Sequence, residues 1–291
     1  MSYRSIFKPD LFKGQTIVVT GGGSGMGRCT AHELAALGAH VVLTGRKPEK
    51  LDAVAAEIRE DGGECSTYAF DIRDEEAVKT NVKQMLAARG RIHGLVNNAG
   101  GQYPSPLMAI SKKGWEAVVA NNLTGGFLMA REVYNQCMKK HGGSIVNMVA
   151  DMWGGMPGMA HSGAARAGMV NFTETAAVEW ATSGVRVNAI APGWIASSGL
   201  DQYDPAFTKE VIPKMAGEIP LRRLGEEAEV SSVIVFLLSE ASAFVTGVCV
   251  KIDGGASLNT KLFPLQPAPN AKPYQGFHRA VRPKALDVLG N

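Results

Sequence analysis

Between Gln15 and Gly255 the sequence alternates short runs of β-branched apolar residues with longer segments of helical period. This alternation is typical of βαβ units, in which crossover helices join parallel strands. It predicts one α/β domain with a doubly wound parallel sheet and helices on both faces. The seven expected strands are Thr16–Thr20, His40–Thr44, Ser66–Ala69, Ile92–Asn97, Ser144–Val149, Val185–Ile190 and Val248–Ile252.

Two segments show the helical period clearly, and the end of the chain shows none. Lys50–Glu60 and Glu75–Ala88 each place apolar residues three or four positions apart on one face. Residues 257–291 contain five prolines and no clear period. We therefore expect the 291 residues to form one domain, with a core over 12–258 and a C-terminal arm over 259–291. The arm is expected to pack on the body or on a neighbouring subunit.

Composition excludes several classes of partner. Hydrophobic residues make up 45% and charged residues 20%, and Lys plus Arg number 30 against 27 Asp plus Glu, without a block of like charge. We expect no nucleic-acid partner and no membrane partner.

The scattered cysteines lack metal-ligand spacing, so we expect reduced thiols and no metal. The N-terminal residues form no apolar leader, and the last residues are not a peroxisomal address, so a cytoplasmic location is expected.

A glycine-rich segment follows the first predicted strand. Residues 20–27 read TGGGSGMG, and a segment of helical composition follows from Arg28. Glycines at a strand-to-helix turn allow backbone N–H groups to approach a pyrophosphate at the positive end of the helix. A glycine run alone is equally consistent with a tight turn, but the strand before it and the helix after it favour a dinucleotide site.

Several motifs together resemble the short-chain dehydrogenase/reductase family over about residues 12–258. They are the Thr-Gly-x-x-x-Gly-x-Gly loop from Thr20, NNAG at 97–100, PG at 192–193 and DGG at 253–255. The resemblance implies a Rossmann fold, a nicotinamide cofactor and a homotetramer built through helices that begin near Trp115 and Ser162. It implies cofactor contacts at Gly21, Ser24, Gly25, Met26, Gly27, Asp71, Ile72, Asn98, Ala99, Gly100, Pro192, Gly193 and Ile195.

The end of the second strand indicates which cofactor is preferred. An acidic residue at this point would accept hydrogen bonds from the ribose hydroxyls of NAD. This sequence has Arg46 followed by Lys47. A guanidinium matches a phosphate in charge and geometry, so Arg46 is expected to hold the 2′-phosphate of NADP(H). A solvated basic pair at a helix start is the alternative. In the family, the position of Asp71 contacts the adenine.

The chain departs from the family where the chemistry takes place. Most members use a Tyr-x-x-x-Lys pair as acid and ribose anchor, helped by a serine and an asparagine. Residues 160–168, AHSGAARAG, put Ser162 at the tyrosine position and Arg166 at the lysine position. The serine position falls on Val149 or Ala150, and Asn122 keeps the asparagine. A serine hydroxyl is a far weaker acid than tyrosine, and arginine does not release its proton. The usual interconversion of alcohol and ketone therefore lacks its acid.

A more specific resemblance follows from this departure. Residues 161–168, with GGQY at 100–103, SKKGW at 111–115, HGGSIVN at 141–147 and EWA at 179–181, are similar to peroxisomal trans-2-enoyl-CoA reductases. The 2,4-dienoyl-CoA reductases also lack the tyrosine. The resemblance implies NADPH-dependent reduction of the C=C bond of a trans-2-enoyl-CoA, a small-molecule acyl thioester. Asn122 and Ser162 would then donate to the developing enolate oxygen, and Arg166 would hold the nicotinamide ribose.

Two further side chains are candidates, each with a structural alternative. His161 is a candidate acid or a structural hydrogen-bonding residue, and Tyr103 is a candidate substrate contact or a loop-packing residue. Trp153, Trp194 and nearby methionines are expected to line an apolar pocket or to fill the core. Two other functions stay open. They are a dehydrogenase for an apolar alcohol, aldehyde or ketone such as an acyclic terpenoid, and a catalytically degenerate nucleotide-binding protein.

Overall fold

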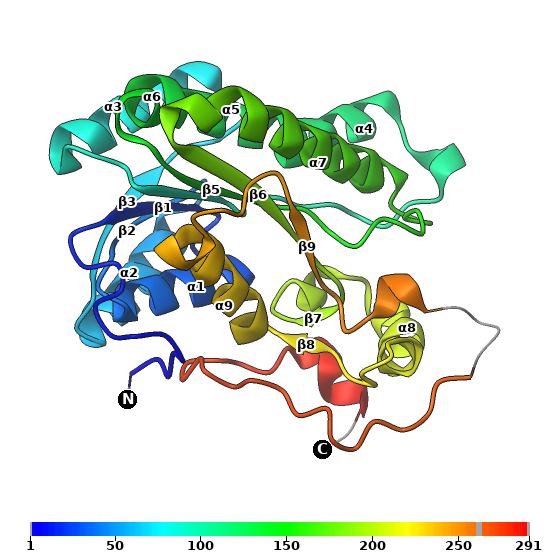
Figure 1. Ribbon diagram of the computed structural model, residues 1–291. Coiled ribbons are helices and arrows are strands. Elements are labelled where there is room, and N and C mark those ends of the chain that lie inside the picture. Colours follow the sequence, from blue (N-terminus) through cyan, green and yellow to red (C-terminus); the bar gives the residue numbers. More distant parts are fainter. Residues whose placement is uncertain (1, 260–263, 290–291) are drawn as a thin grey trace.

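Seven parallel strands form one sheet in the computed structural model, which describes residues 2–259 and 264–289. The order across the sheet is β3-β2-β1-β4-β5-β6-β9 (Figure 1). The order runs outward from β1 on one side and from β4 on the other, so the sheet is doubly wound, as predicted. The strands are β1 (Thr16–Thr20), β2 (His40–Gly45), β3 (Glu64–Ala69), β4 (Gly94–Asn97), β5 (Gly143–Met148), β6 (Val185–Pro192) and β9 (Cys249–Ile252).

The bounds of β1 are as predicted, and the other six strands differ from theirs by at most two residues at either end; β3 and β4 show the physical reasons. β3 begins at Glu64, two residues early, where Glu64 pairs with His40 of β2. Because β3 is an edge strand, its side chains are only partly buried, and its sequence lacks a continuous apolar run. β4 begins at Gly94 rather than Ile92. The N–H of Ile92 donates to Sγ of Cys137, 3.4 Å away, instead of to a neighbouring strand.

Helices cover both faces of the sheet (Figure 1). Strand side chains alternate between the two layers: Ile17 and Val19 of β1 face one core and Val18 faces the other. No described helix is long and apolar enough to cross a membrane. One face carries α1 (Gly25–Ala36), α2 (Pro48–Glu60) and α9 (Glu227–Leu238), and the other α3 (Glu75–Arg89), α4 (Lys112–Val119), α5 (Gly125–Val133), α6 (Lys139–His141) and α7 (Ala160–Trp180).

Several smaller elements connect the helices and strands of the main sheet. β7 (Ile195–Ala196) and β8 (Gly225–Glu226) form a two-stranded parallel ladder, and α8 (Pro205–Glu218) connects them. Two π-helical turns, Ala120–Thr124 and Tyr134–Met138, separate α4, α5 and α6. Short 3-10 helices cover Leu107–Ala109, Ala181–Ser183, Leu200–Gln202, Glu240–Ser242, Ala256–Leu258 and Lys284–Leu289.

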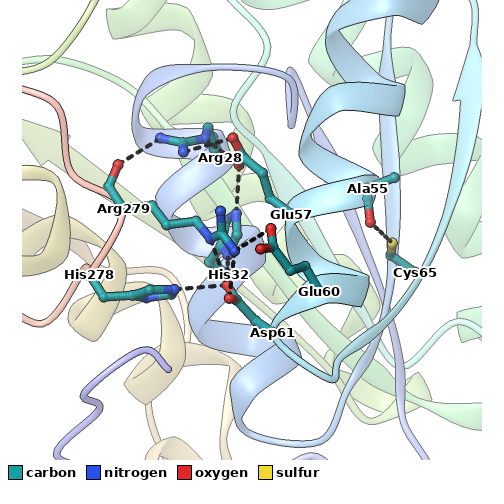
Figure 2. Close-up of polar contacts among 9 residues, drawn as sticks. All are labelled: Arg28, His32, Ala55, Glu57, Glu60, Asp61, Cys65, His278 and Arg279. Atoms are coloured by element: carbon teal, nitrogen blue, oxygen red, sulfur yellow. Dashed lines mark hydrogen bonds and ion pairs between the residues drawn. The ribbon is translucent and has the colours of Figure 1, made fainter. Parts of the chain in front are cut away.

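The described part of the C-terminal arm, residues 264–289, runs back along the face formed by α1, α2 and α9 (Figure 1). The Phe277 ring stacks on Tyr3, with centroids 5.7 Å apart. Arg279 donates to Asp61 at 2.7 Å, and Nε2 of His278 lies 2.8 Å from the same carboxylate. Figure 2 shows both side chains reaching Asp61 from the arm. Of the two predicted positions for the arm, these contacts place it on the body of its own chain.

Candidate active site

The loops that follow β1, β4, β5 and β6 meet at the carboxyl edge of the sheet, because parallel strands all end on the same side. The strand order changes direction between β1 and β4. In doubly wound sheets, ligands bind in the crevice at such a point. The glycine loop, the NNAG segment and the start of α7 all lie at this edge, so the structure gathers the predicted cofactor and reaction residues there.

The glycine loop leaves no room for side chains at two positions. A Cβ on Gly21 would lie 2.9 Å from Nδ2 of Asn98, and Gly21 has a φ of +66°. A Cβ on Gly27 would lie 2.4 Å from both Nδ2 of Asn98 and the carbonyl oxygen of Gly21. Ser24 precedes α1, and its side chain makes no capping hydrogen bond. The first N–H groups of α1 are therefore available to an anion.

Asn98 and Thr20 hold this loop in place. Oγ1 of Thr20 accepts hydrogen bonds from the N–H groups of Asn98 and Ala99, at 3.0 and 2.9 Å. Nδ2 of Asn98 donates to the carbonyl oxygens of Thr20 and Gly21, at 2.8 and 3.3 Å. The Asn98 side chain thus braces the loop through its amide nitrogen.

At the adenosine end, the structure adds a residue that the sequence interpretation did not include. Arg46 is exposed directly after β2. Arg73 binds the Asp71 carboxylate, with Nε 2.9 Å from Oδ1, and its guanidinium is the main cause of a lowered Asp71 pKa. An adenine contact by Asp71 would therefore compete with Arg73. The side chain of Ile72 is buried.

Arg166 is buried on α7, where the family has a lysine. Its exposed fraction is 7%, and Nη1 donates to the carbonyl oxygen of Met148 at 2.6 Å. Nε is buried without a hydrogen-bond partner among the described residues. Burial lowers the pKa of the guanidinium to about 10, so it stays protonated at neutral pH. A buried donor without a partner is destabilising, so this nitrogen is suited to a ligand oxygen.

Asn122 does not have the free donor that its predicted role requires. It lies in the π-helical turn Ala120–Thr124, and Nδ2 donates to the carbonyl oxygens of Gly101 and Val118, at 2.7 and 2.9 Å. Oδ1 accepts from the N–H of Gly101 at 3.1 Å. Both amide protons are thus engaged by the backbone. In this geometry Asn122 fixes the loop at Gly101, and its role as a donor to the substrate stays a prediction.

Ser162 and His161 form a buried pair at the start of α7. Both side chains are fully buried. The Ser162 hydroxyl donates to Oε1 of Gln102 at 3.3 Å, a long distance for such a bond. Nδ1 of His161 accepts from the N–H of Ser162 at 2.9 Å, so the proton of a neutral ring is on Nε2. That Nε2 is buried without a hydrogen-bond partner among the described residues.

The loop between β4 and α4 covers this pair. Tyr103 packs edge-on against the His161 ring, with centroids 4.7 Å apart, and is 41% exposed. The neighbouring Gln102 is the acceptor of the Ser162 hydroxyl. Sequence reasoning gave Gln102 no role, although the GGQY motif contained it. Tyr103 thus packs within the loop against His161, and its role as a substrate contact stays a prediction.

The opposite wall contains a separate cavity. Pro192 ends β6, and Gly193 packs so closely on Asp253 that a Cβ would lie 2.9 Å from that residue. Ile195 is buried in β7. A cavity of about 480 Å³ is lined by Trp194 and by residues at the end of β9. Trp153 is instead 43% exposed, beneath the ammonium of Lys251 at 4.2 Å. Of the two tryptophans, Trp194 therefore fits the predicted pocket wall better.

Known proteins match most of the chain. Residues 21–257 match a family model described as enoyl-(acyl carrier protein) reductase. The chain belongs to the short-chain dehydrogenase/reductase family. It is therefore an oxidoreductase of a family that uses nicotinamide cofactors and acts on small molecules.

Individual members of the family differ in the substrates that their names give. A probable 2,4-dienoyl-CoA reductase of Bacillus subtilis is 36% identical over 84% of this chain and 97% of its own. A 3-oxoacyl-(acyl-carrier-protein) reductase of Synechocystis is 39% identical over 83% of this chain and 96% of its own. The solved structure of a citronellol catabolism dehydrogenase (AtuB) of Pseudomonas aeruginosa is 65% identical, with a TM-score of 0.79, over 88% of this chain and 100% of that one.

The residues present fit the dinucleotide that this family uses. Gly21 and Gly25 have positive φ angles, +66° and +56°, which suit glycine at a loop that approaches a pyrophosphate. The uncapped start of α1 offers N–H groups, and Nε of Arg166 is a buried donor without a partner among the described residues. Both ends of the crevice therefore have donors for a phosphate or a ribose oxygen.

Proposed function

We propose that this short-chain dehydrogenase/reductase uses NADPH to reduce the C=C bond of a trans-2-enoyl thioester. The observation that carries the proposal is the buried pair at the start of α7. Where most of the family has an acidic tyrosine, this chain has two hydrogen-bond donors, the Ser162 hydroxyl and Nε2–H of His161. These donors can stabilise an enolate oxygen as it gains negative charge. They are less suited to an alcohol or ketone oxygen, which has to lose or gain a proton.

The chemistry explains why such donors suffice. When bound, NADPH would supply the hydride that adds to the β-carbon of the enoyl group. The electron pair of the C=C bond moves toward the thioester oxygen, and donors placed there stabilise the resulting enolate. The α-carbon then takes a proton from solvent, which completes the saturated thioester. His161 and Ser162 hold the oxygen, and Arg166 holds the nicotinamide ribose.

The substrate has to displace the loop that covers these donors. Ser162 and His161 are fully buried, and Gln102 and Tyr103 of the loop contact them. The Ser162–Gln102 bond is long, and Tyr103 is already partly exposed, so few contacts oppose the movement. Asn98 and Gly101, at the start of the loop, are held by hydrogen bonds to Thr20, Gly21 and Asn122. We infer that the side chains of Gln102 and Tyr103 move aside to admit the acyl chain, while the backbone up to Gly101 keeps its place.

The preference for NADPH rests on Arg46. It is exposed after β2, on the side of the sheet edge where Asp71 and Arg73 also lie, and its charge helps to lower the pKa of Asp71. With Arg73 bound to that carboxylate, Arg46 remains available to a 2′-phosphate. The predicted homotetramer and the cytoplasmic location stay predictions.

A second candidate is a dehydrogenase for an acyclic terpenoid alcohol or aldehyde. The 65% identity with the citronellol catabolism dehydrogenase favours it. Oxidation of an alcohol needs a group that accepts the hydroxyl proton. Of the two nitrogens of His161, the one that accepts a hydrogen bond is Nδ1, and the Ser162 N–H occupies it. The geometry therefore supports enoyl reduction better than alcohol oxidation.

Consumption of NADPH, followed by the absorbance of the reduced nicotinamide, tests the proposal. A medium-chain trans-2-enoyl-CoA and a branched terpenoid enoyl-CoA are compared with citronellal, and citronellol is supplied with NADP⁺. Turnover with either enoyl-CoA and formation of the saturated thioester support the proposal. Turnover only with the alcohol or aldehyde would establish the second candidate. Cofactor binding without any turnover would indicate a nucleotide-binding protein.

A further inference from the structure

The start of α9 places a carboxylate beside the glycine loop. A Cβ built on Gly25 would lie 3.9 Å from Oε1 of Glu227 and 3.9 Å from Oγ of Ser198. Gly25 is the first residue of α1, whose N–H groups are available to a phosphate. Glu227 therefore lies close to the α1 N–H groups to which the proposed function assigns the pyrophosphate of the dinucleotide. No motif in the sequence drew attention to this residue.

Glu227 differs from the two acidic residues around it. Glu226 caps α9 with its side chain, and Glu229 returns a hydrogen bond to the Glu226 N–H at 2.9 Å. Glu229 is also paired with Arg223 at 2.7 Å. By contrast, no side chain in the described ranges donates a hydrogen bond to Glu227 or forms an ion pair with it. The helix start thus has its own capping carboxylates, and Glu227 is not needed as one.

The cation on α1 that acts on Glu227 is held elsewhere. Arg28 donates to both carboxylate oxygens of Glu57, at 2.7 and 3.0 Å, and to the carbonyl oxygen of Arg279 at 3.2 Å (Figure 2). Its guanidinium also lies over the Phe277 ring, 4.9 Å from the centroid. The C-terminal arm and α2 therefore fix Arg28 in place, and it does not pair with Glu227.

The surroundings favour the protonated form of Glu227. Burial is the main cause that raises its pKa, to about 7; the charge of Glu226 adds to this effect and the charge of Arg28 opposes it. Cys29 of α1 also interacts with its charge. Glu227 further lines a cavity of about 550 Å³ beneath the arm, and the other charged residues of that cavity are Arg222, Arg223, Glu226 and Arg282.

We propose that Glu227 binds a proton when the cofactor pyrophosphate binds, so that cofactor affinity falls as the pH rises. A pyrophosphate held at the start of α1 would be repelled by the nearby Glu227 carboxylate, and a neutral carboxyl would relieve the repulsion. The proposal rests on the proposed dinucleotide site. It adds a residue that links cofactor affinity to pH.

The direction and size of the pH effect on cofactor affinity follow from the proton linkage of Glu227. The free protein loses the proton from Glu227 at about pH 7. The bound anion raises that pKa further, so above pH 7 the complex holds a proton that the free protein lacks, and each dissociation constant rises with pH. If the bound pKa exceeds 8.5, the dissociation constant should rise on the order of tenfold between pH 7 and 8.5.

The test measures NADPH binding to the full chain by fluorescence at pH 6.5, 7, 7.5, 8 and 8.5. Glu227→Gln keeps the size of the side chain and removes its charge, so it should bind at least as tightly and lose the rise of the dissociation constant. The matched control is Glu240→Gln, an exposed carboxylate after α9, which should keep the wild-type profile. Calorimetry in two buffers of different ionisation enthalpy should show proton uptake for the wild type at pH 8 and a smaller uptake for Glu227→Gln.

The outcomes separate this proposal from the proposed function. A rise of the dissociation constant that is the same in Glu227→Gln and the wild type would overturn the role of Glu227 and leave cofactor use intact. Equal proton uptake by the wild type and Glu227→Gln would also overturn the role of Glu227 and leave cofactor use intact. Absence of NADPH and NADH binding by the wild type at every pH would instead overturn the dinucleotide site, and with it both proposals. Because the 2′-phosphate titrates near pH 6, the comparison is repeated with NADH, where the difference between variants should persist.

Discussion

The glycine loop and the start of α7 lie at the same edge of the sheet, but they differ in how their polar groups are used. At the glycine loop, Thr20 and Asn98 form hydrogen bonds with the backbone and fix its shape. At the start of α7, Nε2 of His161 and Nε of Arg166 are buried without partners among the described residues. Buried polar atoms normally have partners. The polar groups of the first region are therefore satisfied within the protein, whereas the second has buried donors that suit a ligand.

The largest expected effect comes from disturbing the glycine loop. Gly27→Ala would put a Cβ 2.4 Å from the Gly21 carbonyl oxygen and from Nδ2 of Asn98, so the loop has to shift. We expect NADPH affinity to fall on the order of 10²-fold or more, from roughly 3 kcal/mol of overpacking and lost alignment. Binding is measured by NADPH fluorescence. Gly217→Ala on α8, where a Cβ meets nothing within 4 Å, is the control and should bind normally. Normal NADPH binding by Gly27→Ala would show that the glycine loop does not bind the cofactor.

The next largest effect is expected at the start of α7, where a substitution should lower turnover and leave cofactor binding unchanged. Ser162→Ala removes one of the two donors at the start of α7, and we expect turnover of an enoyl-CoA to fall about 10²-fold, near 3 kcal/mol. KM and NADPH affinity should change little, because the hydroxyl acts in the transition state. Asn122→Ala is the contrasting variant: it frees the carbonyl oxygens of Gly101 and Val118, so it should lower the free energy of unfolding as well. Unchanged turnover in Ser162→Ala would exclude the hydroxyl and leave His161.

A smaller effect is expected at the adenosine end. Arg46→Asp replaces the cation after β2 with the acidic residue typical of NAD enzymes, and we expect the ratio of NADPH to NADH affinity to fall about tenfold or more. The two dissociation constants are measured on the same preparation. Lys47→Gln, which removes the adjacent charge, should change the ratio less. If the wild type already bound NADH as tightly as NADPH, Arg46 would be only a solvated cation.

These regions also differ in what the sequence could predict. The strands of the sheet and the glycine loop were predictable because β-branched runs, helical period and turn glycines act locally. The bonds of Asn122 to Gly101 and of Ser162 to Gln102 were not, since they join segments 21 and 60 positions apart. Glu227 was missed for the same reason, because it meets the glycine loop from a distant part of the chain. Arg73 was missed for a different one: it pairs with Asp71 two positions away, and such a loop pair leaves no periodic signal. The C-terminal arm has no helical or strand period in its sequence. It packs on the body because Arg279 and His278 contact Asp61.

The smallest predicted effect concerns that contact, which ties the arm to the glycine-loop side. Asp61 accepts hydrogen bonds from Arg279 at 2.7 and 2.9 Å, and these are the main cause of its lowered pKa. A lowered folded pKa stabilises the fold above the unfolded pKa near 4, and this contribution is lost as the pH falls through the folded value. Asp61→Asn should therefore lower the free energy of unfolding by about 1 kcal/mol at pH 7, since solvent screens the pair, and by much less below pH 4.

Urea unfolding at pH 7 and pH 3.5 measures this difference. Glu60→Gln, which removes a largely exposed partner of Arg279, should change stability by less than about 0.5 kcal/mol. Because Asp61 contacts the arm and His32 of α1 and lies far along the chain from α7, NADPH affinity should fall modestly while the turnover of bound substrate is kept. A loss of turnover at saturating NADPH would mean that the arm supports the reaction residues as well as the glycine loop, and the contrast between the two regions would then be wrong.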